Sequence, residues 1–168
     1  MSVKSPYGGP VLVCGLGRFG AATAAALARL GYEVLAIDRD SKIVQDWSDR
    51  LAHVVEADTT DIDVLRELGC ADFRVAVVGI ATSIESSVLT CANLVDLRVD
   101  QVWSKAMSPA HGKILSRIGV HHVIYPEAST AERVARLVNG RMLDYMEFDD
   151  GFAIVKMRPP KETQGFTL

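Results

Sequence analysis

The chain has 168 residues, of which 49% are hydrophobic and 23% charged, and its formal net charge is −3. This length suits one domain, or one domain with part of a second, and the charge balance argues against a nucleic-acid or membrane-surface binder. No apolar run approaches the roughly 18 residues of a membrane span, and the polar start lacks the apolar core of a signal peptide, so we expect a cytoplasmic protein.

The first predicted element is a short buried strand over Val11–Cys14, which runs directly into a glycine-rich turn. Glycines at 15, 17 and 20 form the pattern G-x-G-x-x-G, and a helix is predicted over about 18–30. Gly15 permits the tight turn, Gly17 leaves room for a phosphate, and Gly20 lets the helix pack close to the strand. The helix amides then face the phosphates, so the segment predicts a nucleotide site.

The second predicted strand, Val34–Ile37, ends at an acidic residue, Asp38, which lies 18 residues after Gly20. A carboxylate at this strand end can accept hydrogen bonds from ribose hydroxyls. The alternative is an ordinary glycine turn followed by a surface aspartate. The order of strand, glycines, helix and acid favours the nucleotide site.

Strand-like and helix-like segments alternate along most of the chain. This alternation predicts an α/β fold, a Rossmann-like doubly wound parallel sheet of about six strands with helices on both faces. The predicted strands are Val11–Cys14, Val34–Ile37, His53–Glu56, Val75–Gly79, Val102–Ser104 and His122–Tyr125, followed by helices at about 18–30, 41–51, 61–68, 84–97, 109–118 and 129–145.

Ligands of such sheets bind beyond the carboxyl ends of the strands, so the residues that follow each strand are the candidate site. Two cations among them, Arg18 and Lys105, can meet phosphate oxygens, and the Arg18 guanidinium suits a terminal phosphate through bidentate contacts. The candidates are Gly15, Gly17, Arg18, Phe19 and Gly20, then Asp38, Arg39, Asp58 and Thr59, then Gly79, Ile80, Ala81, Lys105 and Glu127.

The last predicted helix differs from the others. Ser129–Glu132 has the form of a capping box, and an apolar stripe follows at helical spacing through Ala131, Val134, Ala135, Val138, Met142 and Tyr145. Periodicity leaves two readings open: packing on its own sheet, or an arm that packs on a second subunit. A turn at 147–151 and a strand at Phe152–Met157 follow. The strand has no predicted partner, so we expect a second domain beyond it.

The motifs taken together resemble the RCK (KTN, or TrkA-N) family, cytoplasmic gating subunits and domains that regulate potassium transport, and within it the Ktr-type regulatory subunit. The resemblance covers roughly residues 10–158. It rests on motifs that dehydrogenases do not share. These are Gly15–Gly20, Leu35–Asp38, Ala57–Asp61, Val75–Gly79, Val102–Ala106, His111–Leu115, Ile118–Gly119 and Val123–Glu127.

The resemblance implies a role for individual positions. Arg18 corresponds to the arginine that reaches the terminal phosphate, often of the neighbouring subunit's nucleotide, and Asp38 to the ribose-binding acid. Asp58 and Thr59 lie where adenine is held, and Lys105 and His111 match residues near the phosphates. Glu127 matches a glutamate that helps to hold a divalent cation, Mg²⁺ or Ca²⁺, at a dimer interface.

The resemblance also implies an organisation and partners. The helix from Ser129 matches a crossover helix that joins two lobes into a homodimer, with assembly into an octameric ring, and a membrane potassium channel or transporter subunit is the further partner. The chain would then lie at the inner face of the cell membrane. The expected parts are a flexible leader (1–9), a nucleotide-binding lobe (10–128), a dimerisation helix (129–146), and a strand that starts a missing carboxy-terminal lobe (147–168).

Three functions compete. The first is a regulatory subunit that senses ATP and ADP, which the terminal-phosphate role of Arg18 favours. The second is the same subunit with NAD or NADH as its ligand. The third is a small NAD-dependent oxidoreductase, for which no Tyr-x-x-x-Lys proton-transfer pair is present: neither Tyr125 nor Tyr145 has a lysine four residues on. We therefore expect no enzymatic activity.

Overall fold

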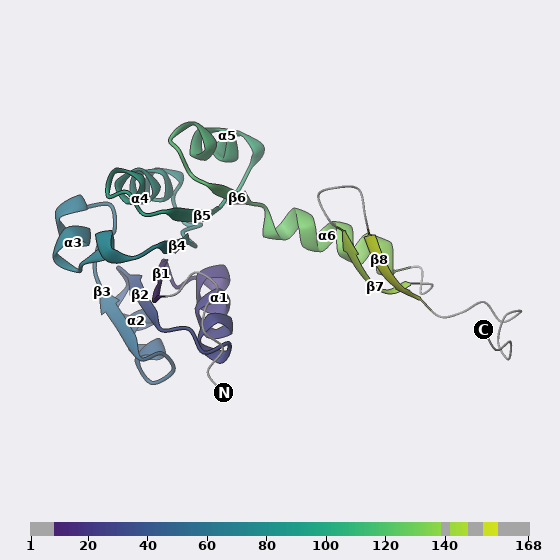
Figure 1. Ribbon diagram of the computed structural model, residues 1–168, viewed down its shortest axis with the longest axis horizontal. Helices are drawn as coiled ribbons and strands as arrows, with labels where there is room; N and C mark the ends of the chain where they lie inside the picture. Colours follow the sequence, from purple (N-terminus) through teal and green to yellow (C-terminus); the bar gives the residue numbers. More distant parts are fainter. Residues whose placement is uncertain (1–8, 139–141, 148–152, 158–168) are drawn as a thin grey trace, which may run out of the picture. The chain divides into compact units, whose positions relative to one another are not determined.

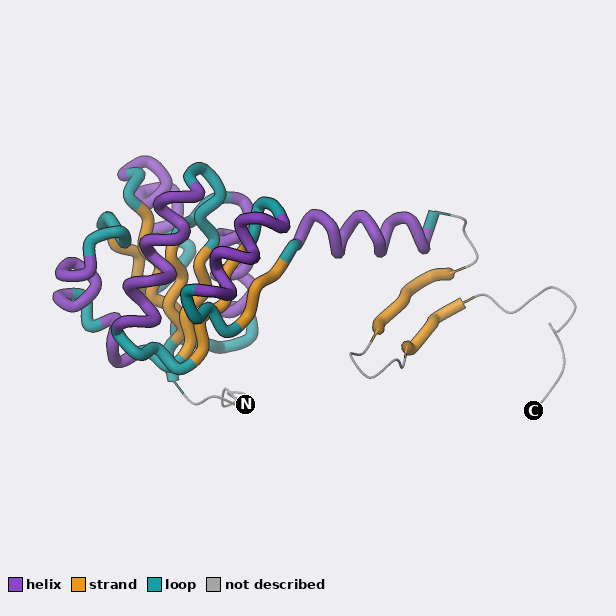
Figure 2. Tube along the Cα trace, turned by 90° about the horizontal axis from the view of Figure 1, so that it is seen from above, coloured by secondary structure: helices purple, strands orange, loops and turns teal. Residues whose placement is uncertain are grey.

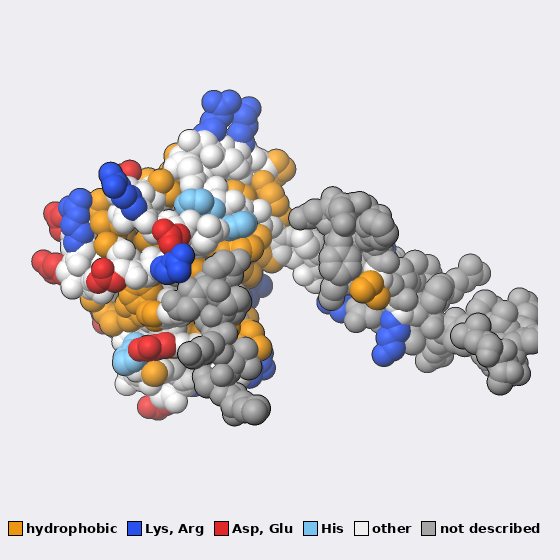
Figure 3. Space-filling model, in the orientation of Figure 1, with side chains coloured by type: hydrophobic (Ala, Val, Ile, Leu, Met, Phe, Trp, Pro, Cys, Tyr) orange, Lys and Arg blue, Asp and Glu red, His pale blue; other side chains and the backbone are white. Residues whose placement is uncertain are grey.

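The computed structural model describes residues 9–138, 142–147 and 153–157 (Figure 1). Contacts divide the chain into two units, Met1–Tyr125 and Pro126–Leu168, and each is described by itself. Every helix in the described part of the chain is too short or too polar to cross a membrane. Figure 3 shows acidic and basic side chains interspersed on the visible face, as expected for a net charge of −3.

The first unit is built on one parallel sheet of six strands in the order β3-β2-β1-β4-β5-β6. The chain winds outward from β1 in one direction and then, after β3, returns to β4 on the other side of β1. This arrangement confirms the predicted doubly wound α/β fold. The strands are β1 (Val11–Cys14), β2 (Val34–Asp38), β3 (His53–Glu56), β4 (Val75–Val78), β5 (Gln101–Lys105) and β6 (His122–Ile124).

Helices cover both faces of this sheet (Figure 2). One core cluster joins α1 and α2 to one face, and a second joins α3, α4 and α5 to the opposite face. The helices are α1 (Arg18–Arg29), α2 (Ser41–Ser48), α3 (Ile62–Glu67), α4 (Ile84–Asp96) and α5 (Pro109–Arg117), with a short 3₁₀ turn, η1, at Cys70–Asp72.

The central strand β1 shows why the sequence forms a sheet buried on both sides. All four of its residues are buried. Successive side chains of a strand point to opposite faces, so Val11 and Val13 enter the core under α1 and α2 while Leu12 and Cys14 enter the other core. A continuous apolar run is therefore required, because there is no solvent-facing side.

The helices begin directly at the carboxyl edge of the sheet because polar residues cap them there. The side chains of Asp40, Asp61, Ser83 and Ser108 accept hydrogen bonds from backbone amides at the starts of α2, α3, α4 and α5. These caps satisfy amides that the helix itself leaves unpaired. The amino ends of the helices consequently gather at one edge of the sheet.

Three glycines cross at the end of β1. Gly15 has φ +88°, a conformation that other residues adopt only with strain. A Cβ added at Gly20 would overlap the Gly15 carbonyl oxygen, and one at Gly79 would lie 2.8 Å from the Gly20 Cα. Gly17 differs, because a Cβ added there would have no atom within 4 Å. Gly15, Gly20 and Gly79 are thus required by packing, whereas Gly17 leaves open space.

The second unit corrects the prediction for the end of the chain. The predicted helix at about 129–145 is instead α6 at Pro126–Leu137, followed by strand β7 at Met142–Glu147. Met142 and Tyr145 therefore lie in a strand and not on the helical stripe. The sequence Asn139-Gly140 is a helix-stopping signal that the periodicity argument passed over, because the apolar spacing continued beyond it.

Two smaller predictions in this unit are also wrong. Ser129 lies inside α6 and cannot cap it, since the helix starts at Pro126, a residue type that suits a first helical turn. The last strand, β8 (Ala153–Met157), has a partner, because it pairs antiparallel with β7. Of the predicted turn at 147–151, Glu147 ends β7 and the rest lies outside the described residues.

The glycine crossing generates a stability prediction. Gly20→Ala places a methyl group against backbone that cannot move aside, so we expect the free energy of unfolding to fall by about 3 kcal/mol. Gly17→Ala is the matched control, with an expected change within about 1 kcal/mol. Urea unfolding followed by circular dichroism measures both variants. Equal losses of stability in the two would contradict this distinction.

Candidate nucleotide-binding site

A pocket of about 460 Å³ opens at the carboxyl edge of the sheet. Residues at or just after the carboxyl ends of β1, β2, β3, β4 and β5 line it, and it includes the position between β1 and β4 where the strand order reverses. Doubly wound sheets bind their ligands at this reversal. The lining comprises Gly15, Gly17, Arg18, Phe19, Asp38, Arg39, Asp40, Ile43, Asp58, Gly79, Ile80, Ala81, Thr82, Ser86 and Lys105.

The glycine turn forms the side of the pocket suited to phosphate. The Gly15 amide donates to the Ile37 carbonyl at 2.7 Å, which joins the turn to β2. Gly17 is the N-cap of α1 and has no side chain with which to cap the helix amides. Those amides and the positive end of the helix dipole are therefore available to an anion. Arg18, the first residue of α1, is exposed and lines the pocket.

Asp38 connects this turn to the end of β2. Its Oδ2 accepts a hydrogen bond from the Leu16 amide at 2.6 Å, and its Oδ1 accepts one from the Asp40 amide at 2.9 Å. An ionised carboxylate has about four acceptor positions, so two remain for the hydroxyls of a ribose. Asp38 thus holds the phosphate turn in place and offers its remaining acceptors to a ligand in the same pocket.

Asp58 stands at the end of β3, on the same side of the pocket as β2. Its Oδ1 accepts hydrogen bonds from the Thr60 hydroxyl at 2.7 Å and the Thr60 amide at 2.9 Å. The hydroxyl hydrogen bond, then the amide bond, and to a smaller degree the charge of Arg39 hold the pKa of the Asp58 carboxyl below its usual value. The carboxyl is thus ionised at neutral pH.

Charge is divided across the pocket. The carboxylates Asp38, Asp40 and Asp58 come from the ends of β2 and β3, where Arg39 also lies, whereas Arg18 at the start of α1 and Lys105 at the end of β5 contribute cations away from these carboxylates. Lys105 is only 7% exposed. Anionic groups are favoured near the cations, and groups with hydrogen-bond donors are favoured near the carboxylates. The pocket can therefore orient a molecule that is anionic at one end and carries hydroxyls at the other.

Two of the predicted residues in the first unit point elsewhere. Thr59 is 6% exposed, and its hydroxyl hydrogen-bonds with the Thr90 hydroxyl at 2.8 Å. His111 is 1% exposed, and its Nδ1 accepts from the Met107 amide at 3.3 Å. Burial lowers the pKa of His111. Neither residue lines the pocket, and Gly20 packs beneath it.

Glu127 belongs to the second unit, where it lies in the first turn of α6. Within the described ranges, no group of three or more His, Cys, Asp or Glu side chains is placed to hold a metal ion. Its predicted contact with a cation at a dimer interface thus remains a prediction.

Four residues that line the pocket were not predicted from the sequence: Asp40, Ile43, Thr82 and Ser86. Asp40 caps α2 and Ile43 lies in the first turn of that helix. Thr82 precedes α4, and Ser86 lies in its first turn. After the second and fourth predicted strands the prediction stopped two residues on, whereas the pocket also reaches the first turns of α2 and α4. Cap signals such as Asp40 could have extended it.

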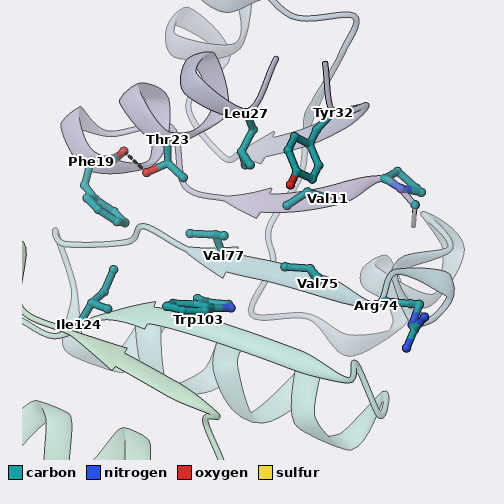
Figure 4. Close-up of a pocket in the computed structure, with 12 residues that line it drawn as sticks. Val11, Phe19, Thr23, Leu27, Tyr32, Arg74, Val75, Val77, Trp103 and Ile124 are labelled. Carbon is teal, nitrogen blue, oxygen red and sulfur yellow. Dashed lines mark hydrogen bonds between the residues drawn. The ribbon is translucent and has the colours of Figure 1, made fainter. Parts of the chain in front are cut away.

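A second, apolar hollow of about 270 Å³ lies beside α1. We call it the groove. Figure 4 shows Phe19 and Leu27 of α1 on one side, Val75 and Val77 of β4 below, and Trp103 farther across the sheet. Its remaining lining is Gly9, Pro10, Val11, Thr23, Tyr32, Arg74 and Ile124.

Comparison with known proteins places this chain among potassium transport proteins. The TrkA-N domain family matches residues 11–126. Ktr system potassium uptake protein C of Bacillus subtilis is 37% identical over 157 residues, which are 93% of this chain and 71% of that protein. Ktr system potassium uptake protein A of the same organism is 34% identical over 146 residues, which are 86% of this chain and 66% of that protein.

Solved structures share the fold at lower identity. The TrkA-N domain of the Escherichia coli inner membrane protein ybaL superposes with a TM-score of 0.69 at 14% identity, covering 77% of this chain and 96% of that one. The GsuK channel bound to NAD superposes with a TM-score of 0.61 at 19% identity, covering 69% of this chain and 21% of that one. GsuK bound to ADP superposes with a TM-score of 0.61 at 18% identity, covering 74% of this chain and 33% of that one.

The two bonds of Asp38 generate a prediction. Asp38→Asn leaves one acceptor oxygen and turns an amide donor toward the second backbone N–H, so the phosphate turn should loosen. We expect faster hydrogen exchange at the Leu16 amide and a nucleotide affinity lower by about ten-fold. Asp46→Asn, on α2 and away from the pocket lining, is the control. Unchanged hydrogen exchange at the Leu16 amide would contradict the role of Asp38 in holding the phosphate turn in place.

Thr60 provides a pH-dependent test. Because the folded pKa of Asp58 is lowered, its contribution to stability is present above the unfolded pKa and is lost as pH falls through the folded pKa. Thr60→Val removes the hydroxyl donor, so the Asp58 pKa should rise, the contribution to stability should become smaller, and its loss should be complete at a higher pH. NMR titration of the Asp58 carboxyl measures this pKa, with Thr82→Val as the control variant. An unaltered Asp58 pKa in Thr60→Val would refute this cause.

Proposed function

The chain belongs to the TrkA-N family, and from that premise we propose that it is a nucleotide-sensing regulatory subunit of a potassium transport system. The observation that carries the proposal is the pocket at the strand-order reversal, lined by the glycine turn, by the cations Arg18 and Lys105, and by three carboxylates from the ends of β2 and β3. The relatives are named as potassium uptake proteins, which supports regulation of transport, not catalysis.

The ligand that we favour is ATP, exchanging with ADP. Arg18 and Lys105 line the pocket, and a guanidinium makes its strongest contacts with a highly charged terminal phosphate. A nucleotide that lacks the γ-phosphate loses part of that contact. The two nucleotides therefore differ most at Arg18, which gives the subunit a means of distinguishing them.

A nucleotide regulates only if it binds two conformations with different affinity. In this proposal ATP and ADP bias the arrangement of paired lobes, and the membrane partner responds to that arrangement. The pairing is a homodimer through the segment 129–146, with further assembly into a ring of eight, on the cytoplasmic side of the membrane. A divalent cation held through Glu127 belongs to the same proposal.

NAD or NADH is the second candidate. The Asp38 carboxylate retains acceptors for a ribose, as dinucleotide sites require. GsuK has been solved with NAD and with ADP, so proteins of this fold accept either class of ligand. A dinucleotide has no terminal phosphate for Arg18, which is why we place it second.

Calorimetric titration of the purified chain with ATP, ADP, NAD and NADH, with and without Mg²⁺, tests the proposal. We expect ATP to bind. Arg18→Ala should lower the affinity for ATP by about ten-fold and the affinity for ADP by less. Arg29→Ala, at the opposite end of α1, is the matched control and should leave both affinities unchanged. Tighter binding of NADH than of ATP, or an Arg18→Ala variant with normal ATP affinity, would overturn the ATP assignment.

A further inference from the structure

His111 is a buried histidine that does not belong to the nucleotide pocket. It lies in α5, is only 1% exposed and is absent from the pocket lining. Its Nδ1 accepts a hydrogen bond from the Met107 amide at 3.3 Å. A backbone amide can only donate, so Nδ1 carries no proton and the proton of the neutral ring is on Nε2. Burial lowers the pKa of His111, which favours this neutral ring at pH 7.

The Nε2 atom of His111 is buried and has no hydrogen-bond partner among the residues that the structure describes. A buried N–H group without a partner costs stability, and an apolar side chain of similar size avoids that cost. Stability alone therefore does not explain a histidine at this position. What a histidine supplies, and an apolar residue does not, is the Nδ1 acceptor for the Met107 amide.

The bond to Met107 closes the loop between β5 and α5. The Ser108 hydroxyl accepts a hydrogen bond from the His111 amide at 3.2 Å, so this loop is bonded to His111 through both its backbone and its ring. At the start of the loop, the Ala106 amide donates to the Ile124 carbonyl of β6 at 2.8 Å. The backbone that follows β5 is thus held at both ends.

Lys105 directly precedes this loop. It is the last residue of β5, is 7% exposed and lines the nucleotide pocket. Successive side chains of a strand point to opposite faces, so Lys105 shares a face with Trp103, which packs on the core under α1 and α2. Helix α5 packs on the opposite face through Leu115. The connection from His111 to Lys105 therefore runs through the backbone of the loop.

We propose that His111 is a positioning residue: its bond to the Met107 amide fixes the loop after β5, and the fixed loop holds Lys105 where its ammonium group meets the phosphates of a nucleotide in the pocket. This inference rests on the proposed function, since it takes a nucleotide as the ligand. The attraction between two charges depends on their distance, so a loop that is free to move should lower the affinity for a polyphosphate. The bond to the loop itself can be tested without any ligand.

Three substitutions of His111 in the full chain separate the roles of its two ring nitrogens. In His111→Asn the Oδ1 atom can take the position of Nδ1 and accept from the Met107 amide, whereas His111→Gln carries its polar atoms one bond farther and His111→Leu has none. Hydrogen exchange at the Met107 amide should become faster by about ten-fold or more in the Leu and Gln variants and stay near the wild-type rate in the Asn variant. Calorimetry should show the same pattern, with an ATP affinity lower by about ten-fold in the Leu and Gln variants only.

Two comparisons distinguish positioning from a general structural role. In a Lys105→Met background, adding His111→Leu should lower the ATP affinity no further, because the contact through which His111 acts is already lost. The matched control is His121→Leu. The Nδ1 of His121 accepts from the Val102 amide at 3.0 Å, which is the same kind of bond at the opposite end of β5. Its loss should leave the ATP affinity unchanged.

The outcomes decide separate statements. Normal Met107 exchange in both His111→Leu and His111→Gln overturns the role of the ring in holding the loop, whether or not a nucleotide binds. Faster exchange with normal ATP affinity overturns the positioning of Lys105, and so does a further loss of affinity when His111→Leu is added to Lys105→Met. A His111→Asn variant as impaired as His111→Leu overturns Nδ1 as the group responsible. Binding of no nucleotide by the wild-type chain overturns the proposed function and the phosphate contact of Lys105 with it, while the exchange rates still decide whether His111 holds the loop.

Discussion

The close crossing of three backbone segments at Gly15, Gly20 and Gly79 is the constraint on which the site depends. The Gly79 amide donates to the Cys14 carbonyl at 2.8 Å, so the ends of β1 and β4 are joined where α1 begins. Side chains at these positions would push the segments apart. Because they are absent, the first amides of α1 lie beside the strand-order reversal, and the phosphate side of the pocket exists there.

The second determinant is the division of charge around that crossing. Asp38 links the glycine turn to β2 through the Leu16 amide, so the residue best suited to a ribose also holds the phosphate turn. Arg18 and Lys105 face a ligand from the other side. A pocket built in this way can orient a molecule that is anionic at one end and carries hydroxyls at the other.

The aromatic side chain of Phe19 lines both the nucleotide pocket and the groove of the first unit, and this has a structural cause. Helix α1 must start at the glycine crossing to present its amides, and its flank then borders the uncovered half of the sheet face. Phe19, one residue inside the helix, consequently reaches both sides.

Prediction from sequence succeeded where local chemistry and periodicity determine the outcome. The apolar run of β1, the glycine turn and Asp38 each require their structure for reasons contained within a few residues, and strand ends of a parallel sheet necessarily share an edge. Prediction failed where the determining partner is distant in sequence. The spacing of Met142 and Tyr145 fits a helix, but pairing with β8 makes this segment a strand.

The sequence by itself therefore determined the order of strands and helices in the first unit, the edge of the sheet at which the pocket opens, and the residues of the glycine turn with their acid. Only the tertiary structure decided which strand-end side chains face the pocket. Thr59 is turned toward Thr90 and His111 is buried, whereas Ile43 and Ser86 line the pocket. The reason is physical: the direction of a side chain depends on the packing of neighbouring helices, and that packing joins residues that periodicity cannot relate.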